Sequence, residues 1–195
     1  MKKRAILATR LEDGLTDLAY TLLNAGHELI TDNHAGRIIA MAGLPVTPVE
    51  FATRQSKITL GRTASLHYSL HAGIAVDTAD AKQVSALAAA SMTRVDVVVA
   101  QLPQAVSDFG EHPEATLFRS DWPATAALLQ SAIARFDRVV TLCDPATFAD
   151  AKDAFGDSEE AVATRKKLAI TALKHLGGYQ AALLEAIAGP QGWDA

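Results

Sequence analysis

The stretch "RAILATRLEDGLTDLAYTLLNAGHELIT", residues 4–31, decides the fold class. It opens with a short apolar run, residues 4–9, followed by a break, which is typical of a buried strand. Leucines then recur at helical spacing over residues 15–23, and Gly26 can end that helix. "HELIT", residues 27–31, indicates a second strand. A strand, a helix and a second strand in this order predict a parallel sheet in an α/β protein.

The same alternation continues outward to the C-terminus, although residues 50–80 show no clear period. The last helix is long enough to hold a bend at Gly177–Gly178. The predicted segments are 35–45 (helix), 45–50 (extended), 81–93 (alanine-rich helix), 94–103 (strand), 107–121 (loop), 122–136 (helix), 137–145 (strand), 144–155 (helix) and 158–188 (helix).

Composition bounds the class of protein. The chain has 195 residues, of which 49% are apolar, enough for one domain with a sizeable core. A net charge of −4 argues against binding to nucleic-acid backbones, which needs a basic face. No apolar run reaches the roughly 18 residues of a membrane span, and the first one is too short for a secretory leader. The single cysteine, Cys143, allows no internal disulfide. We expect a cytoplasmic protein without nucleic-acid or membrane partners.

In open parallel sheets, ligands bind beyond the carboxyl ends of the strands. The predicted strand ends lead into residues 9–14, 31–36, 101–104 and 144–147. The first two segments precede helices, whose free backbone N–H groups could hold a phosphate. Neither has the glycine spacing of a P-loop or a dinucleotide fingerprint, so solvated turns remain the alternative.

The segment "GRTASLHYSLHAGI", residues 61–74, gathers an arginine and two histidines. Arg62 could hold an anion through two hydrogen bonds, or it could tie the loop to a structural carboxylate. His67 and His71 are four residues apart, as in a helical metal pair. Because no third ligand is evident, structural hydrogen bonding is favoured for both histidines.

Seven segments, in family order, resemble the IMP cyclohydrolase domain, the N-terminal half of bifunctional AICAR formyltransferase/IMP cyclohydrolase. They are "KRAILA", "AGHELI", "AGLPVTPV", "LGR…LH…HAGI", "VDVVVAQL", "VVTLCDPATF" and "TRKKLAITALKHLGGYQAALLEAI". The resemblance implies a methylglyoxal-synthase-like fold, a three-layer α/β sandwich with a mainly parallel sheet and C-terminal helices. We expect residues 1–195 to form one such domain without the formyltransferase half, because the chain stops where that half would begin.

The resemblance also implies a reaction, the closure of formyl-AICAR to IMP with release of water. The carboxamide nitrogen attacks the formyl carbon, so a group must remove the amide proton and donors must stabilise the developing oxyanion. A cationic or N–H-rich pocket must hold the ribose phosphate. The reaction needs no metal and no organic cofactor. An active enzyme would belong to the cyclic amidine hydrolase class.

Two loops that bind phosphate in the family are altered. The Ser-Val-Ser-Asp-Lys-Thr-Gly loop corresponds to residues 8–14, where only Gly14 is kept and Glu12 replaces the lysine. The Ser-Thr-Gly-Gly-Thr loop corresponds to residues 31–35, where both glycines are lost and Asp32 is introduced. Carboxylates at these places oppose the binding of a phosphate.

Three further motifs of the family can be aligned with this sequence, but some of their side chains are replaced. In Gly-Arg-Val-Lys-Thr-Leu-His-Pro, the matching positions are Gly61, Arg62, Leu66 and His67, and the altered ones are Ala64 for lysine, Ser65 for threonine and Tyr68 for proline. Asn-Leu-Tyr-Pro-Phe becomes residues 101–105, which lack the tyrosine. Asp-Ile-Gly-Gly becomes "SDWPAT", where Asp121 aligns with the aspartate within one residue and Ile133 or Ala134 replaces a second lysine.

These comparisons give a list of candidate site residues: Arg62, Ser65, His67, Arg10, Asn33 and Gln101 for substrate binding, and Asp121 for catalysis. Asp121 could be a general base, or it could cap the helix that holds Pro123. Arg10 could replace a lost lysine or lie in a solvated turn. Gln101 could bond a base edge or an amide. The sequence favours packing roles for Cys143, His175 and Tyr179.

Three functions remain open. The favoured one is an IMP cyclohydrolase-like protein with a degenerate site, which binds a purine ribotide or another phosphate ligand with little or no activity. The second is a genuine stand-alone IMP cyclohydrolase with a rebuilt site. The third is a non-catalytic scaffold or partner subunit, for which a separate formyltransferase is the candidate partner. We also expect a homodimer, because the helices at 82–92 and 123–135 are alanine-rich and weakly charged.

Overall fold

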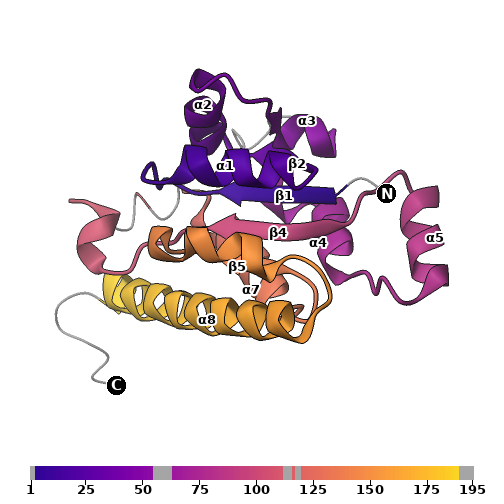
Figure 1. The fold of residues 1–195 in the computed structure, drawn as a ribbon. Coiled ribbons are helices and arrows are strands. Elements are labelled where there is room, and N and C mark those ends of the chain that lie inside the picture. Colours follow the sequence, from indigo (N-terminus) through magenta and orange to yellow (C-terminus); the bar gives the residue numbers. More distant parts are fainter. Residues whose placement is uncertain (1–2, 55–62, 112–115, 117–119, 189–195) are drawn as a thin grey trace.

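A computed structural model describes residues 3–54, 63–111, 116 and 120–188. In these residues the chain forms a five-stranded sheet with the order β3-β2-β1-β4-β5 (Figure 1). Every neighbouring pair of strands is parallel. The α/β class and the parallel sheet predicted from the sequence are therefore confirmed. The strands are β1 (Lys3–Ala8), β2 (His27–Thr31), β3 (Thr47–Pro48), β4 (Val95–Ala100) and β5 (Val140–Leu142).

Helices cover both faces of the sheet and give the molecule three layers (Figure 1). On one face lie α1 (Leu15–Asn24), α2 (Asn33–Met41) and the 3-10 helix η3 (Pro145–Ala154). On the other face lie α3 (Val49–Thr53), α4 (Tyr68–Ala75) and α7 (Trp122–Ile133). The long helix α8 (Glu159–Ala188) runs along the edge strand β5 and contacts α7 and η3. The remaining elements are η1 (Ala64–Leu66), α5 (Ala81–Ala89) and η2 (Val106–Phe109).

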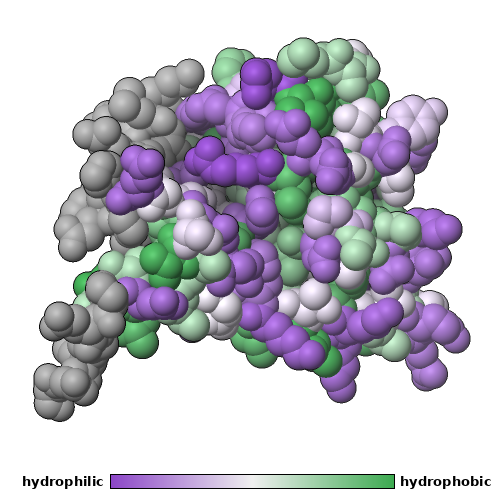
Figure 2. Space-filling model, turned by 90° about the vertical axis from the view of Figure 1, so that its left-hand side faces the viewer, coloured by the Kyte–Doolittle hydropathy of each residue, from purple (hydrophilic) through white to green (hydrophobic). Residues whose placement is uncertain are grey.

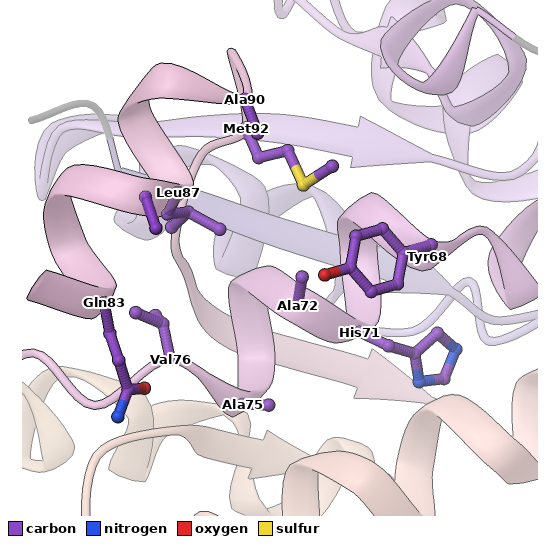
Figure 3. A pocket seen from close by; sticks show the side chains of 10 residues that line it. Tyr68, His71, Ala72, Ala75, Val76, Gln83, Leu87, Ala90 and Met92 are labelled. Atoms are coloured by element: carbon purple, nitrogen blue, oxygen red, sulfur yellow. The ribbon is translucent and has the colours of Figure 1, made fainter.

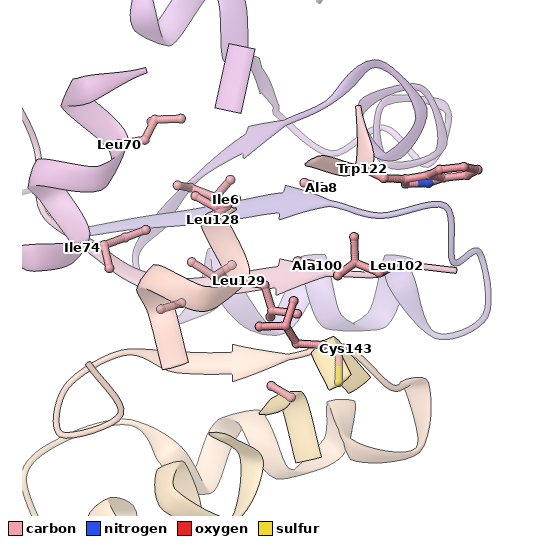
Figure 4. Packing of buried hydrophobic residues seen from close by; sticks show 14 of the residues in the cluster. Ile6, Ala8, Leu70, Ile74, Ala100, Leu102, Trp122, Leu128, Leu129 and Cys143 are labelled. Atoms are coloured by element: carbon pink, nitrogen blue, oxygen red, sulfur yellow. The ribbon is translucent and has the colours of Figure 1, made fainter. Parts of the chain in front are cut away.

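The strands divide the core into two clusters because successive side chains point to opposite faces of a sheet. Ala5 and Leu7 of β1 pack with α1 and α2. Ile6 and Ala8 point the other way and pack with α4 and α7, as Figure 4 shows for Ile6 and Leu128. Strands buried on both faces explain the continuous apolar runs in the sequence.

Polar contacts tie α8 to both ends of the sheet. The buried Arg165 donates hydrogen bonds to the backbone carbonyl oxygens of four residues in two loops, Phe136, Asp137, Ala154 and Gly156. Farther along the helix, His175 Nε2 accepts a hydrogen bond of 3.0 Å from the backbone N–H of Leu102, just after β4. The Gln104 side chain donates to the carbonyl oxygen of His175. Tyr179 is buried in the core, so His175 and Tyr179 have the packing roles expected of them.

Several elements differ from the sequence prediction. Residues 50–80 contain α3, η1 and α4, although they show no period. Residues 145–154 form a 3-10 helix, and the segment predicted as a loop over 107–121 includes part of η2. Helix α8 continues through Gly177–Gly178 as one element. The described residues contain no helix both long and apolar enough to cross a membrane.

The two helices expected to pair copies of the chain differ in exposure. α7 buries six side chains in the core, so it does not offer the free face that the sequence led us to expect. α5 buries only Leu87. A groove of about 450 Å³ separates α5 from α4, with Tyr68, Ala72 and Met92 among its lining residues (Figure 3).

Candidate functional site

The strand order reverses between β1 and β4, which lie side by side at the centre of the sheet. Ligands of open α/β sheets bind at such a reversal, outside the carboxyl ends of the strands. Here the chain leaves β1 at Thr9 and β4 at Gln101, and the backbone N–H of Gln101 donates to the Ala8 carbonyl at 3.3 Å. Figure 2 looks onto this edge of the molecule, where hydrophilic residues gather. We therefore build the candidate site from the loops at this edge.

Arg10 and Asp121 meet at this edge. Arg10 Nη2 lies 3.3 Å from Asp121 Oδ1, although 111 positions separate the two residues in sequence. Asp121 occupies the N-cap position of α7, but its side chain makes no capping hydrogen bond. The interpretation of this side chain as a helix cap is therefore wrong. Asp121 instead pairs with Arg10, whose side chain is 57% exposed.

Asp32 belongs to the same electrostatic environment. It caps α2, where its Oδ1 accepts a hydrogen bond of 2.7 Å from the backbone N–H of Ala35. The pKa of Asp32 is raised to about 6, mainly by burial and also by the Asp121 carboxylate, while the cap hydrogen bond and Arg10 act in the opposite direction. A carboxyl group with a pKa near neutrality, beside a second carboxylate and an arginine, is typical of functional sites.

Glu12 and His34 add to this group. His34 Nε2 lies 3.6 Å from Glu12 Oε1, which joins the loop after β1 to the first turn of α2. Three of the side chains described so far at this edge, Glu12, Asp32 and Asp121, are carboxylates, and Arg10 is paired with the last of them. Such an edge attracts hydrogen-bond donors and cations more readily than phosphate.

The other candidate residues make structural contacts or lie at the surface. Asn33 is exposed at the first position of α2, and Gln101 is half-buried after β4. The Ser65 carbonyl accepts a hydrogen bond from His71 Nε2 at 3.0 Å. His67 Nδ1 accepts from the Ser69 backbone N–H at 3.2 Å and so caps α4. These contacts do not bring Ser65 or His67 onto the Arg10–Asp121 pair.

The sequence of residues 61–74 raised two questions, the role of its two histidines and the role of Arg62, and the structure answers only the first. Both histidines make structural hydrogen bonds, as the sequence favoured. Within the described ranges, no three His, Cys, Asp or Glu side chains gather closely enough to hold a metal ion. Gly61 and Arg62 lie outside the described residues, so the role of Arg62 stays a prediction.

One acidic residue at this edge was missed by the sequence analysis. Glu50 lies in the first turn of α3, directly after β3, and is 7% exposed. Its Oε2 is buried and has no hydrogen-bond partner among the described residues. Its signal in the sequence is the short extended segment 45–50, because the end of that segment also lies at the carboxyl edge of the sheet. A buried carboxylate oxygen without a partner is costly, and a ligand that donates a hydrogen bond would relieve that cost.

Cys143 lies directly after β5 and is buried. The pKa of its thiol is raised to about 12, mainly by burial and also by the nearby Asp144 carboxylate. A thiol that stays protonated is a poor nucleophile. This agrees with the core role expected from the sequence.

Comparison with known proteins first defines the class. The fold is that of the crystal structure of ForH, with a TM-score of 0.80, 23% identity, and coverage of 95% of this chain and 98% of that chain. No protein-family model matches the chain. The chain is thus an α/β protein with a ForH-like fold, and its candidate site lies where the central strands end.

Sequence relatives define the family. The chain is 28% identical to the bifunctional purine biosynthesis protein PurH of Chloroflexus aurantiacus over 183 residues, and 32% identical to PurH of Synechococcus sp. strain WH7803 over 189 residues. These matches cover 92% and 94% of this chain and 36% of each relative. The chain therefore spans about a third of the length of the relatives it matches. The resemblance seen in the sequence is confirmed: the chain is similar to PurH over more than nine-tenths of its own length.

Proposed function

We propose that the chain binds a nucleotide-like small molecule at the carboxyl edge of its sheet, and that it closes formyl-AICAR to IMP very slowly or not at all. The observation that carries this proposal is the Arg10–Asp121 pair beside the half-buried Asp32. Asp32 lies in a loop that corresponds to a phosphate loop of the IMP cyclohydrolase domain. A carboxylate there disfavours a phosphate. The ligand is therefore recognised mainly through its base and ribose.

The low ring-closing activity that we propose is supported by side chains of the family site that this chain lacks. Ala64 stands at the position of one family lysine, and Pro103 stands where the family has its tyrosine. The loss of a preorganised donor costs about a hundredfold in turnover or more. With several such donors lost from one site, the protein keeps the ability to bind a ligand but has little or no ring-closing activity.

One observation favours a second function, a genuine ring-closing enzyme with a rebuilt site. Asp32, with a pKa of about 6, is suited to take a proton from a carboxamide and return it near neutral pH. In this case Asp32 transfers the proton in place of the lost lysines, and Arg10 offsets the negative charge of the neighbouring Asp121.

Binding and turnover separate the two functions. Thermal unfolding is measured with AICA ribonucleoside and with its ribotide, and ring closure of formyl-AICAR is followed by absorbance. The binding proposal expects both ligands to raise the melting temperature by a similar amount and no measurable ring closure. Turnover on the order of 1 s⁻¹, ordinary for an enzyme, would establish the second function instead. Asp32→Asn should then lower that turnover by about a hundredfold or more, whereas Asp144→Asn, at another helix cap, should not.

The remaining expectations complete the proposal. Residues 1–195 act as one IMP cyclohydrolase-like unit in the cytoplasm. The ligand is a small molecule of the purine ribotide kind, and neither a metal nor an organic cofactor takes part. If neither ligand changes the melting temperature at millimolar concentration, the binding proposal fails. The favoured function is then that of a scaffold whose partner is a separate formyltransferase.

A further inference from the structure

A small polar cavity lies at the amino edge of the sheet, opposite the candidate site. Its volume is about 160 Å³. Four strands begin beside it, since its lining includes Lys3 of β1, His27 of β2, Asp96 of β4 and Val140 of β5. In Figure 1 this is the side where β1 starts, next to the N label. Drug-sized ligands occupy roughly 300–1,000 Å³, so this cavity suits a single small molecule or ion.

Cationic side chains outnumber carboxylates in the lining of this cavity. The cations are Lys3, Arg94, Arg138 and Arg165, and the carboxylates are Asp96 and Asp157. The lining thus has two more positive than negative formal charges, although the whole chain has a net charge of −4. A concave wall with an excess of one sign of charge concentrates ions of the opposite sign.

Arg165 is a buried charge that no carboxylate offsets. The residue is 2% exposed. Its hydrogen bonds go to backbone carbonyl oxygens, and none of the ion pairs between described residues includes it. Carbonyl oxygens satisfy the N–H groups of a guanidinium but carry no net charge. Because a buried charge without a counter-ion is costly, an anion in the adjoining cavity would stabilise Arg165.

The other two arginines of the lining share one carboxylate. Asp96 Oδ1 lies 2.6 Å from Arg94 Nη2 and 3.6 Å from Arg138 Nη1. The Arg138 side chain is 10% exposed, and its Nε is buried without a hydrogen-bond partner among the described residues. Lys3 is exposed and takes part in none of the ion pairs of the described chain. The positive charge of the lining therefore exceeds what Asp96 can offset.

We propose that this cavity binds a small dianion with the size and charge of inorganic phosphate. Ammonium and guanidinium groups form strong, charge-assisted hydrogen bonds with phosphate oxygens. Lys3 lies at the exposed rim, where its ammonium group can contact the anion. Arg138 and Arg165 act mainly through their charge, because backbone carbonyl oxygens hold most of their N–H groups. The cavity is separate from the carboxyl edge, so this inference stands whether or not a nucleotide-like ligand binds there.

Calorimetric titration with inorganic phosphate, at pH 7 in a chloride buffer, tests the proposal. Wild type should bind phosphate with a Kd of about 1 mM or below. Lys3→Gln should weaken binding roughly tenfold, the scale of one charge-assisted hydrogen bond. Asp157→Asn should tighten binding about two- to fivefold, because it removes an exposed negative charge from the lining. Lys174→Gln, the matched control at an exposed position of α8, should have no effect.

His27 reports where the anion binds. Its Nδ1 lies 3.1 Å from a backbone carbonyl oxygen, which can only accept a hydrogen bond, so Nε2 is the nitrogen that titrates. Burial lowers the pKa of His27 below 6.5, and the charges of Lys3 and Arg94 act in the same direction. The Asp96 carboxylate opposes them. Because a dianion in the cavity adds negative charge, saturating phosphate should raise the pKa of His27 in an NMR titration and leave that of His175 unchanged.

Ribose 5-phosphate is a second probe, which distinguishes two sources of the same dianion. If it binds with the same dependence on Lys3, the anion is the phosphate group of a larger metabolite. If only inorganic phosphate binds, the ligand is the free ion. Either result supports a phosphate site at the amino edge.

Arg10→Ala separates this cavity from the carboxyl edge. The substitution should leave phosphate binding unchanged, and circular dichroism melts verify that each variant is folded. Three results would each overturn the proposal: no binding of phosphate to wild type at millimolar concentration, binding that is lost in Arg10→Ala but kept in Lys3→Gln, or phosphate binding that leaves the His27 titration unchanged.

Discussion

Arg10 and Asp121 bring the loop after β1 against the start of α7, with 3.3 Å between Nη2 and Oδ1. The pair lies at the reversal of strand order, where a ligand would enter. Because more than half of the arginine side chain is exposed to water, the pair contributes to the charge of the site more than to the stability of the fold.

A double-mutant cycle measures how much the Arg10–Asp121 pair contributes to the stability of the fold. For Arg10→Ala, Asp121→Ala and the double variant, the coupling free energy of unfolding should be below about 1 kcal/mol, as for other exposed ion pairs. The measurement is urea unfolding at pH 7 in low salt. A coupling of about 3 kcal/mol or more, typical of buried pairs, would show that the pair holds the fold together.

Asp32→Asn should stabilise the protein at neutral pH. The pKa of Asp32 is raised from 3.8 to about 6, so the folded state holds this proton more tightly than the unfolded state. The free energy of unfolding therefore falls as the pH rises through this window. Asparagine keeps the helix cap without the charge. The expected gain at pH 7 is about 1–3 kcal/mol, and it should be absent at pH 3.

The control for this prediction is Asp144→Asn. Asp144 also caps a helix, with its Oδ1 accepting from the Ala146 backbone N–H at 2.9 Å, but it is exposed. Its substitution should change the free energy of unfolding by no more than about 0.5 kcal/mol. Equal effects of the two substitutions at pH 7 would contradict the interpretation of Asp32.

His175 makes the stability depend on pH in the opposite direction. Burial lowers its pKa below 6.5, and its Nε2 accepts the Leu102 N–H only when the ring is neutral. The folded state therefore binds this proton more weakly than the unfolded state, and stability falls as the pH drops below 6.5. In His175→Gln, an amide oxygen can accept the same hydrogen bond. The melting temperature of this variant should drop less between pH 7.5 and 5.5 than that of the wild type, and an equal drop would disprove the role.

Gly73→Ala should destabilise the fold. A methyl group at this position would collide with the backbone carbonyl oxygen of Thr93, because α4 packs closely on the segment that leads into β4. The cost of such overpacking is about 1–3 kcal/mol. Gly177→Ala is the matched control, since a methyl group there meets no described atom within 4 Å. It should stabilise α8 by up to about 1 kcal/mol.

The sheet could be predicted from the sequence because its strands are buried on both faces. Residues 5–8 and 97–100 are apolar runs followed by a polar residue, and such runs can be identified without knowledge of the rest of the chain. α4 could not be predicted, since its cap is His67 rather than one of the usual capping residues. Its residues also mix small, apolar and aromatic side chains without a helical period.

The candidate site could be predicted only in part. The rule for strand ends selected residues 9–14 and 31–36, and the family resemblance selected Asp121. No local pattern shows that Arg10 faces Asp121 across 111 positions, or that Asp32 is buried enough to hold its proton near neutral pH. Both facts depend on the order of the strands, which brings the ends of β1 and β2 beside the start of α7.

None of the described candidate residues belongs to either core cluster. Arg10, Gln101 and Asp121 follow or precede the strands and helices whose apolar side chains hold the layers together, and Asn33 is the first residue of such a helix. Replacing such residues changes what the edge recognises and leaves the packing beneath it unaltered. Over the history of a lineage, this separation lets binding chemistry diverge while the architecture persists. The apolar layers of this fold can thus be kept while the charges at its carboxyl edge change.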